Sequence, residues 1–386
     1  MTDLQATNNT GSIRIFHIID HLSLHGAQMY LVKLVRGLSE LGYEQRVYGL
    51  NDPRHPKIVD MMTEVGVDVE TIGKVRLLSG TGLLTLLVDL VKWRPHVVQT
   101  CLRFSDVIGR ILGRLAHVPV SVSVVTQPNV DKYRWQFLLD RLTAGFSDRV
   151  VFNSKEIIPF ALAREGIKPE QVVFIPNGID IEAGNSTTAG SLRTRLHISP
   201  DAPVIGFVAR FYPQKGHSIL LSAFAKVLEE EQHAILLLIG DGPLRPELES
   251  QAAALSVNAN VRFVGEYANL SEIWDSIDLY VQASLWEGMS IALMQAMLSE
   301  IPVVATAVDG TIELIEDEKT GFLVKPGDVA ALAFAVVRAL KNTELAKQIG
   351  KNGSAMINRE YSVSMMVSRF DDMYRQLLGL EPRCEQ

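Results

Sequence analysis

The sequence predicts an α/β protein made of two doubly wound, Rossmann-like domains. At about 150 residues per domain, a chain of 386 residues corresponds most simply to two domains. Short apolar runs alternate with longer amphipathic segments throughout, which is typical of βα units on parallel sheets. With 47% hydrophobic and 21% charged residues, the composition excludes a disordered or low-complexity scaffold.

The first half of the chain contains a series of short apolar runs that predict strands, with helical segments between them. The clearest helix, 28–41, has leucine and valine at helical spacing and a stop signal at Gly42. The predicted strands are Ile13–Ile19, Gln45–Gly49, Val67–Ile72, Val97–Thr100, Val120–Val125, Arg149–Phe152 and Val172–Ile175.

A small, polar segment at 183–190 is the best linker in the chain, and a second series of strands follows it. The buried, β-branched character of these strands suits a sheet that is covered on both faces. They are predicted at Pro203–Ala209, Ala234–Ile239, Val261–Val264, Leu279–Gln282, Pro302–Ala305 and Gly321–Val324. We therefore expect a first domain at 1–182 and a second beginning at 191.

The net charge of −7 is unevenly spread along the chain. Residues 1–183 carry 20 Lys and Arg against 19 Asp and Glu, a charge of +1, whereas residues 184–386 carry 17 against 25, a charge of −8. The near-neutral first half tolerates an anionic partner or surface better. An acidic chain with few aromatic residues argues against a nucleic-acid partner.

Cysteine content and targeting signals predict a reduced, cytoplasmic protein, soluble or peripheral to a membrane. Two cysteines, Cys101 and Cys384, are too few for a disulfide framework or a thiolate metal site. The polar first dozen residues lack the pattern of a signal peptide, and no apolar run approaches the roughly 20 residues that a membrane helix needs.

Three loops that follow predicted strands carry candidate chemistry. Arg210 and Lys215, just before Gly216, could hold phosphates, although they could equally be solvated surface cations. Ser290 is a plausible N-cap, so the amides after it form an anion site made of backbone. Glu287 precedes it and could accept hydrogen bonds from sugar hydroxyls, or simply favour the helix N-terminus electrostatically.

Two glycine-containing turns complete the set of candidates. The turn at Gly240 leads from a strand into a helix and could be an ordinary connection. In the first half, Gly26 likewise joins strand to helix and allows a ligand to approach the backbone closely.

The order and spacing of these motifs resemble the retaining glycosyltransferases of family 4, which have the GT-B architecture of two Rossmann-like domains facing across a cleft. The resemblance covers nearly the whole chain. The motifs that carry it are Gly26-Ala27, Pro176-Asn-Gly-Ile-Asp180, Arg210 with Lys215, Gly240-Asp-Gly-Pro-Leu-Arg245, Glu287-Gly-Met289, Pro302-Val-Val-Ala-Thr306 and Thr320-Gly-Phe-Leu-Val324.

The resemblance implies roles for particular residues. Arg210 and Lys215 would bind the donor diphosphate, Glu287 would bind hydroxyls of the donor sugar, and these three are the expected catalytic set. The other expected donor-binding residues are Gly26, Ala27, Gly240, Val264, Tyr267, Gly288, Met289, Ser290, Ile291 and Gln295. Family members transfer sugars with retention, and the departing phosphate assists the incoming hydroxyl, so no protein nucleophile is required.

The sequence departs from the family pattern in three places. Gln295 stands where the second glutamate of a Glu-x7-Glu pair is usual, and its amide can still hydrogen-bond a ribose. His25 stands where the N-terminal loop commonly has glycine. Gln127 and Asn129 lie where many members carry an acceptor-side histidine, so they are the acceptor-side candidates here.

Other kinds of site have little support in the sequence. Histidines form no His-x3-His or His-Glu-x2-His array, and His17, His21 and His25 straddle a predicted strand end and a loop. No Asp-x-Asp pair occurs, which favours donor binding without a metal ion. The segment 74–94 could be an interfacial helix that contacts a membrane, or a helix packed on the sheet. The amphipathic segment 364–380 would, by resemblance, cross back onto the first domain, giving it residues 1–182 with 364–386 and leaving 191–363 to the donor domain.

The sequence thus predicts a retaining, metal-independent glycosyltransferase of the hexosyltransferase type, with no cofactor besides its nucleotide-diphosphate sugar. UDP-sugars are favoured and GDP-sugars are possible donors; the acceptor would be a glycan, a glycolipid or a small hydroxylated molecule. The alternatives are a catalytically altered relative that binds sugar nucleotide, and a non-enzymatic partner subunit.

Overall fold

The computed structural model describes residues 12–24, 26–126, 132–155, 157–180, 191–267, 270–287 and 289–383. The chain divides into two compact units, which are Met1–Gly178 with Val363–Gln386, and Ile179–Ser362. The sequence predicts that the first domain consists of residues 1–182 and 364–386. The predicted linker, 183–190, lies outside the described residues.

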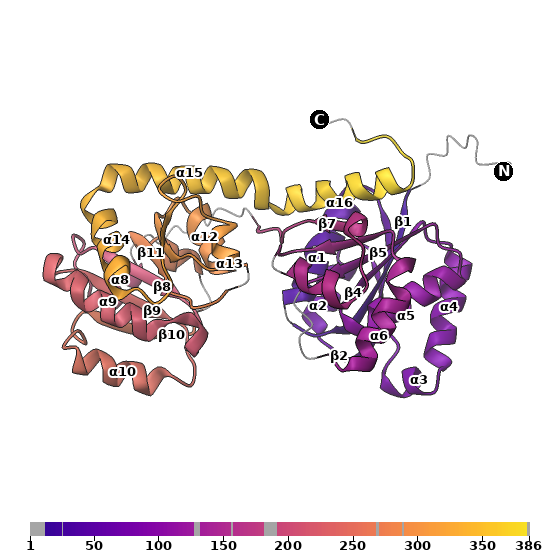
Figure 1. Ribbon diagram of the computed structural model, residues 1–386, viewed down its shortest axis with the longest axis horizontal. Helices are drawn as coiled ribbons and strands as arrows, with labels where there is room; N and C mark the ends of the chain where they lie inside the picture. The colour runs from indigo at the N-terminus through magenta and orange to yellow at the C-terminus, as the bar shows by residue number, and fades with distance from the viewer. Residues whose placement is uncertain are drawn as a thin grey trace. The chain divides into compact units, whose positions relative to one another are not determined.

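The first unit is built on a parallel sheet with strand order β3-β2-β1-β4-β5-β6-β7 (Figure 1). Alternate residues of β1 enter two cores on opposite faces of this sheet. Ile15 and Ile19 pack with α1, α2 and α16, whereas Phe16 and Ile18 pack with α4 and α5. The strands are β1 (Arg14–Leu22), β2 (Glu44–Arg54), β3 (Asp68–Thr71), β4 (Val97–Cys101), β5 (Val120–Val125), β6 (Arg149–Phe152) and β7 (Val172–Phe174).

The helices of this unit cover both faces, and the last of them comes from the C-terminal end of the chain. Phe370 and Tyr374 of α16 are buried against α1 and the sheet, and the Tyr374 hydroxyl donates to Gln99 of β4. The helices are α1 (Gly26–Glu40), α2 (Pro56–Thr63), α3 (Lys74–Leu78), α4 (Thr81–Trp93), α5 (Arg103–Leu115), α6 (Arg134–Thr143), α7 (Ile157–Arg164) and α16 (Val363–Leu377), with 3-10 turns η1 (Ala144–Phe146) and η2 (Pro169–Gln171).

Two helices of the first unit bury charged side chains beneath them. Lys132, just before α6, donates to Asp140 at 2.7 Å and to Glu165 at 2.9 Å, and all three are buried. Beneath α5, Arg110 donates to two serine hydroxyls and Asp106 accepts from the Thr100 hydroxyl at 2.6 Å. Burial raises the pKa of Asp106 to about 7 and also raises the pKa of Asp140, against the opposing effect of nearby cations.

The second unit has a parallel sheet of order β10-β9-β8-β11-β12-β13. Its strands are β8 (Val204–Val208), β9 (Ile235–Ile239), β10 (Val261–Gly265), β11 (Leu279–Gln282), β12 (Val303–Thr306) and β13 (Phe322–Val324). Its helices are α8 (Ser191–Arg195), α9 (His217–Glu230), α10 (Arg245–Ala254), α11 (Leu270–Trp274), α12 (Ile291–Leu298), α13 (Asp309–Ile312), α14 (Val329–Lys341) and α15 (Thr343–Tyr361), with one 3-10 turn, η3 (Pro213–Lys215).

The structure confirms the α/β fold class, and each predicted strand range overlaps a strand of a parallel sheet. The limits of β1 and β2 are the main difference, because their parallel pairing continues as far as Leu22 and Arg54. The polar pair Asp20-His21 therefore lies within β1, so His17 and His21 both lie on this strand before its end at Leu22.

The segment 74–94 forms two helices, α3 and α4, and has features of both alternatives considered for it. Leu86 and Leu90 of α4 are buried in the core above the sheet. Exposed apolar side chains also occur on these helices, at Val75, Leu78, Leu84, Val88 and Val91. Among the described residues, no helix is long and apolar enough to span a bilayer.

Candidate functional site

In the second unit, the loops after β8 and β11 bring Lys215 and Glu287 together. The Lys215 ammonium lies 2.5 Å from Oε2 of Glu287. The same oxygen accepts a hydrogen bond of 3.0 Å from the Ser284 hydroxyl. The other carboxylate oxygen of Glu287 has no partner among the described residues, so it can accept from a ligand hydroxyl.

These two loops are held against each other by backbone contacts. The Leu285 amide donates to the Gln214 carbonyl at 2.8 Å, and the Gln214 side chain donates to the Trp286 carbonyl at 2.9 Å. Gly216 has φ of +66°, and a Cβ there would collide with the Ala283 carbonyl. Glycine is therefore required at position 216 by the packing of the loops, and Lys215 and Glu287 are positioned together.

The predicted backbone anion site lies at the start of α12. Ser290 caps this helix, and its hydroxyl accepts from the Leu293 amide at 3.4 Å, which confirms the predicted N-cap. Met289 and Gln295 are partly buried, and Ile291 is exposed. Gly288 lies outside the described residues. Unpaired amides and the helix dipole at this end favour an anion.

Arg210 lies apart from the contacts that join Lys215 to Glu287. Its side chain is exposed, and its guanidinium lies 5.2 Å from the centre of the Tyr212 ring. Of the three predicted catalytic residues, Lys215 and Glu287 are thus in direct contact. The third, Arg210, lies beside an aromatic ring instead.

The remaining predicted donor residues of this unit have structural contacts of their own. Gly240 has φ of +129°, and a Cβ there would collide with the Ala209 carbonyl, so loop packing alone requires this glycine. Val264 packs at the margin of the core. The Tyr267 hydroxyl donates to Glu272 and accepts from Arg195, so it is already paired.

His217, two residues after Lys215, is a buried histidine that the sequence reading did not single out. Its ring packs against Phe207 and Phe211, with ring centres 4.7 Å away in both cases. Neither ring nitrogen has a hydrogen-bond partner among the described residues. Burial, reinforced by the Lys215 charge, lowers the pKa of His217 to about 4. The ring is therefore neutral at pH 7.

Acidification should destabilise the protein through His217 and through His17, whose pKa burial also lowers to about 4 despite its hydrogen bond with Gln45. Both rings bind protons more weakly when folded than when unfolded. The unfolding free energy should thus fall as the pH drops from about 6.5 to 4, by up to about 3 kcal/mol per ring. Urea denaturation across this range measures it. His217→Phe should make the unfolding free energy depend less steeply on pH, and the exposed His233→Phe should not. An equal dependence on pH in both variants would contradict the assignment.

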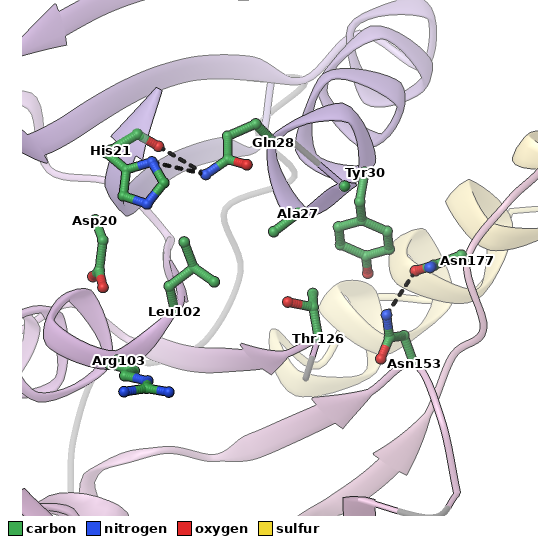
Figure 2. Close-up of a pocket in the computed structure, with 11 residues that line it drawn as sticks. Asp20, His21, Ala27, Gln28, Tyr30, Leu102, Arg103, Thr126, Asn153 and Asn177 are labelled. Atoms are coloured by element: carbon green, nitrogen blue, oxygen red, sulfur yellow. Dashed lines mark hydrogen bonds between the residues drawn. The ribbon is translucent and has the colours of Figure 1, made fainter. Parts of the chain in front are cut away.

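The first unit contains a cavity of about 440 Å³ at the carboxyl ends of its strands (Figure 2). The start of α1 and residues that follow β4, β5, β6 and β7 surround it. Its lining is Asp20, His21, Gly26, Ala27, Gln28, Tyr30, Leu102, Arg103, Thr126, Asn153 and Asn177. This is the edge at which doubly wound sheets bind ligands.

Three buried polar atoms of this lining have no partner among the described residues: Oε1 of Gln28, the Tyr30 hydroxyl and Oδ1 of Asn153. Burial raises the pKa of Tyr30 well above its ordinary value, so the phenol keeps its proton and can donate. Figure 2 shows the Tyr30 hydroxyl on the same side of the cavity as Thr126, Asn153 and Asn177. A neutral cluster of donors and acceptors suits the hydroxyl groups of a sugar.

Asp20 also lines the cavity, but its carboxylate caps a helix. It accepts from the Ser105 amide at 2.7 Å and from the Phe104 amide at 3.0 Å. Leu102, the residue before α5, has φ of +84° and no side-chain acceptor, so β1 supplies the cap instead. Burial raises the pKa of Asp20, and these amide hydrogen bonds oppose the rise.

Gly26 differs from the glycines of the second unit in what surrounds it. A Cβ built at Gly26 would meet nothing within 4 Å among the described atoms, and its φ is not in the left-handed region. The fold itself therefore accepts a larger residue at this position. A requirement for glycine beside Ala27 would come from a ligand that approaches the start of α1.

Sequence reasoning missed most of the cavity lining. Arg103, Asn153 and Asn177 each follow a strand directly or by one or two residues, so a search for polar residues after strand ends would have found them. The acceptor-side candidates Gln127 and Asn129, and His25, lie outside the described residues. In the part of the chain that the structure describes, no three His, Cys, Asp or Glu side chains group as metal ligands would.

Comparison with known families identifies the chain. A family model described as Glycosyltransferase Family 4 matches residues 24–183, and one described as Glycosyl transferases group 1 matches residues 191–356. The chain is a family 4 glycosyltransferase. The predicted family is confirmed, and so is the prediction of an enzyme of the hexosyltransferase type.

Curated relatives of this glycosyltransferase act on different acceptors. It is 25% identical over 306 residues to UDP-Gal:α-D-GlcNAc-diphosphoundecaprenol α-1,3-galactosyltransferase of Escherichia coli, covering 76% of the chain and 78% of that enzyme. It is 24% identical over 385 residues to 2-deoxystreptamine glucosyltransferase of Streptomyces kanamyceticus, covering 92% of the chain and 100% of that enzyme.

Solved structures confirm the GT-B architecture of this glycosyltransferase. HepE of Anabaena, in complex with UDP, has a TM-score of 0.80 at 21% identity, covering 94% of this chain and 100% of HepE. A glycosyltransferase from Rickettsia africae has a TM-score of 0.79 at 16% identity, covering 95% of this chain and 99% of that one.

Proposed function

We propose that this glycosyltransferase transfers a hexose, with retention, from a UDP-sugar to a hydroxyl of a glycan, a glycolipid or a small molecule, in polysaccharide or glycoconjugate synthesis. The observation that carries the proposal is the contact between Lys215 and Glu287 in two interlocked loops beside the start of α12. A GDP-sugar is the second candidate donor. The UDP bound to HepE supports the choice of UDP.

The second unit would bind the two parts of the donor that separate in the reaction, the diphosphate and the sugar. Lys215, with Arg210, would neutralise the charge that develops on the departing diphosphate, together with the amides at the start of α12. The free oxygen of Glu287 would accept from hydroxyls of the donor sugar. We propose that the departing phosphate oxygen takes the proton of the acceptor hydroxyl on the same face of the sugar, so configuration is retained.

Donor binding is proposed to need no metal ion. Lysine and arginine side chains and a helix end provide positive charge for the diphosphate, and the sequence has no Asp-x-Asp pair. No further cofactor is proposed.

The cavity of the first unit is proposed to bind the acceptor. Its neutral hydrogen-bonding groups suit sugar hydroxyls, and the open surroundings of Gly26 allow a phosphate group to approach the start of α1. The names of two relatives, one for α-D-GlcNAc-diphosphoundecaprenol and one for 2-deoxystreptamine, support considering both a lipid-linked and a small-molecule acceptor.

The surface of α3 and α4 suits contact with lipids, which supports a cytoplasmic enzyme that works at the inner face of a membrane. Leu78 and Leu84 are among the exposed apolar residues there, and Lys74, Arg76 and Lys92 supply cations for anionic headgroups. Peripheral membrane contact through the first unit is therefore part of the proposal.

Thermal unfolding with UDP-, GDP- and ADP-sugars, in the presence of EDTA, tests the donor proposal. A UDP-sugar at 100 times its dissociation constant should stabilise the protein by about 2.7 kcal/mol. A selective shift with a GDP-sugar would replace the donor, and a shift that appears only with added divalent ions would overturn metal independence. No shift with any sugar nucleotide would favour the partner-subunit alternative, in which the donor site has lost its function.

A further inference from the structure

The outer surface of α5 and α6 is apolar, although their buried side carries charges. On α6, Trp135, Leu138, Leu139 and Leu142 are between 37% and 65% exposed, at the spacing of one helical stripe. Phe104 at the start of α5 is 51% exposed. An amphipathic helix normally turns such a stripe toward the core, so this one is oriented toward something outside the unit.

A groove of about 140 Å³ runs between the two helices. It is lined by Phe104, Val107 and Ile108 of α5, by Trp135, Gln136, Leu139 and Asp140 of α6, and by Arg103 and Lys132. Arg103 also lines the 440 Å³ cavity that faces the strand ends. In Figure 2 it lies on the same side of that cavity as Asp20 and Leu102. One cation therefore borders a polar cavity and an apolar groove.

The charges that α5 and α6 present outside the core have a single sign. Asp106 and Asp140, the two acidic residues of these helices, are buried. The charged side chains that are not fully buried are Arg103, Arg114, Arg134 and Arg141. Among the described residues of α5 and α6, this apolar surface carries cations and no exposed carboxylate, so it complements an anionic amphiphile.

We infer that the α5–α6 groove binds the hydrocarbon chain of a phosphate-bearing lipid acceptor, with Arg103 at its phosphate and the sugar head in the neighbouring cavity. This inference rests on the proposed function and narrows its acceptor to lipid-linked phosphates. Arg103 is suited to the junction because a guanidinium presents several donors to phosphate oxygens. The alkyl chain would be bound by the apolar groove beside it.

Binding of single-chain alkyl phosphates, below the concentration at which they form micelles, tests the inference without any sugar donor. Trp135 lies in the groove and is one of four tryptophans, so the part of the fluorescence change that Trp135→Phe removes reports occupancy. We expect dodecyl phosphate to bind, decyl phosphate to bind several-fold more weakly, and inorganic phosphate to give no Trp135 signal. Octaethylene glycol dodecyl ether, which has the chain without the charge and without a sugar, should bind at least tenfold more weakly than dodecyl phosphate.

Variants on both walls of the groove separate it from other surfaces. Leu139→Gln and Phe104→Gln should weaken dodecyl phosphate binding at least tenfold at unchanged melting temperature, and Phe334→Gln, at an exposed apolar residue of α14 in the second unit, should not. Equal affinity for both chain lengths, or equal loss in all three variants, would overturn the groove assignment. So would a dimer that Leu139→Gln dissociates, because a second copy would then cover the groove.

The same variants distinguish this inference from the proposed function. UDP-sugar stabilisation reports the second unit, and it should be unchanged in Leu139→Gln and Phe104→Gln. If alkyl phosphates bind but sugar nucleotides do not, the donor proposal fails and the groove stands. If sugar nucleotides bind but alkyl phosphates do not, the groove assignment alone is wrong.

Discussion

Lys215→Ala is expected to lower kcat/KM for sugar transfer by about 10²- to 10³-fold, because it removes a positioned cation from the charge that develops on the departing diphosphate. The fold should persist. Lys215 lies in a surface loop that is held by backbone contacts, and Glu287 keeps its hydrogen bond from Ser284. Initial rates with saturating acceptor, and the melting temperature of the variant, give the two measurements.

Lys341→Ala is the matched control, since Lys341 also forms an ion pair with a glutamate, Glu230 at 2.6 Å, in the same unit. Its side chain is half exposed, and transfer should be unaffected. Turnover that is unchanged in Lys215→Ala would remove Lys215 from the phosphate site. A rate loss of similar size in both variants would point to a general electrostatic effect.

Lys132→Met should be the most destabilising of the substitutions considered, at about 3–5 kcal/mol. It leaves Asp140 and Glu165 buried without the ammonium that both contact, at 2.7 and 2.9 Å. Methionine keeps most of the length of the side chain, so the loss reports the charge rather than a cavity. Urea denaturation of the variant and the parent at pH 7 measures the difference.

The pH dependence of that difference separates charge from packing. Without Lys132, the burial that raises the pKa of Asp140 is no longer opposed by the ammonium, so the folded variant binds a proton at Asp140 more tightly than the unfolded chain. Its deficit relative to the parent should therefore shrink from pH 7 to pH 5. Lys341→Met, at an exposed pair, should leave the unfolding free energy nearly unchanged at either pH. A deficit independent of pH would show that packing, and not charge, accounts for the loss.

The strands could be predicted because each is a short apolar run bounded by turn residues, and parallel sheets bury such runs on both faces. The limits of β1 could not be read from the sequence. Asp20 and His21 are polar, yet pairing with β2 extends the strand through them. The carboxylate of Asp20 also caps α5, by accepting from the amide of Phe104, 84 residues further along the chain. Local pattern does not contain such tertiary contacts.

The candidate site in the second unit was predicted better than the cavity in the first. Lys215, Glu287 and Ser290 lie in short loops with strong local signals of glycine turns and helix caps. The cavity lining comes instead from five strand ends and α1, and Tyr30 in particular reads as an ordinary core residue of an amphipathic helix. In α6, an apolar stripe at helical spacing is exposed, so spacing alone does not tell which face of a helix is buried.

The return of α16 to the first unit affects the order in which the chain can fold during synthesis. Five residues of α16 complete a core that otherwise consists of residues up to Ile175: Met366, Val367, Phe370, Met373 and Tyr374. The ribosome must therefore translate all of Ile179–Ser362 before that core can close. At roughly 5–20 residues per second, the delay is on the order of 10 to 40 s. During this interval the apolar side of α1 lacks the cover that α16 later gives it, while the second unit can fold as soon as it emerges.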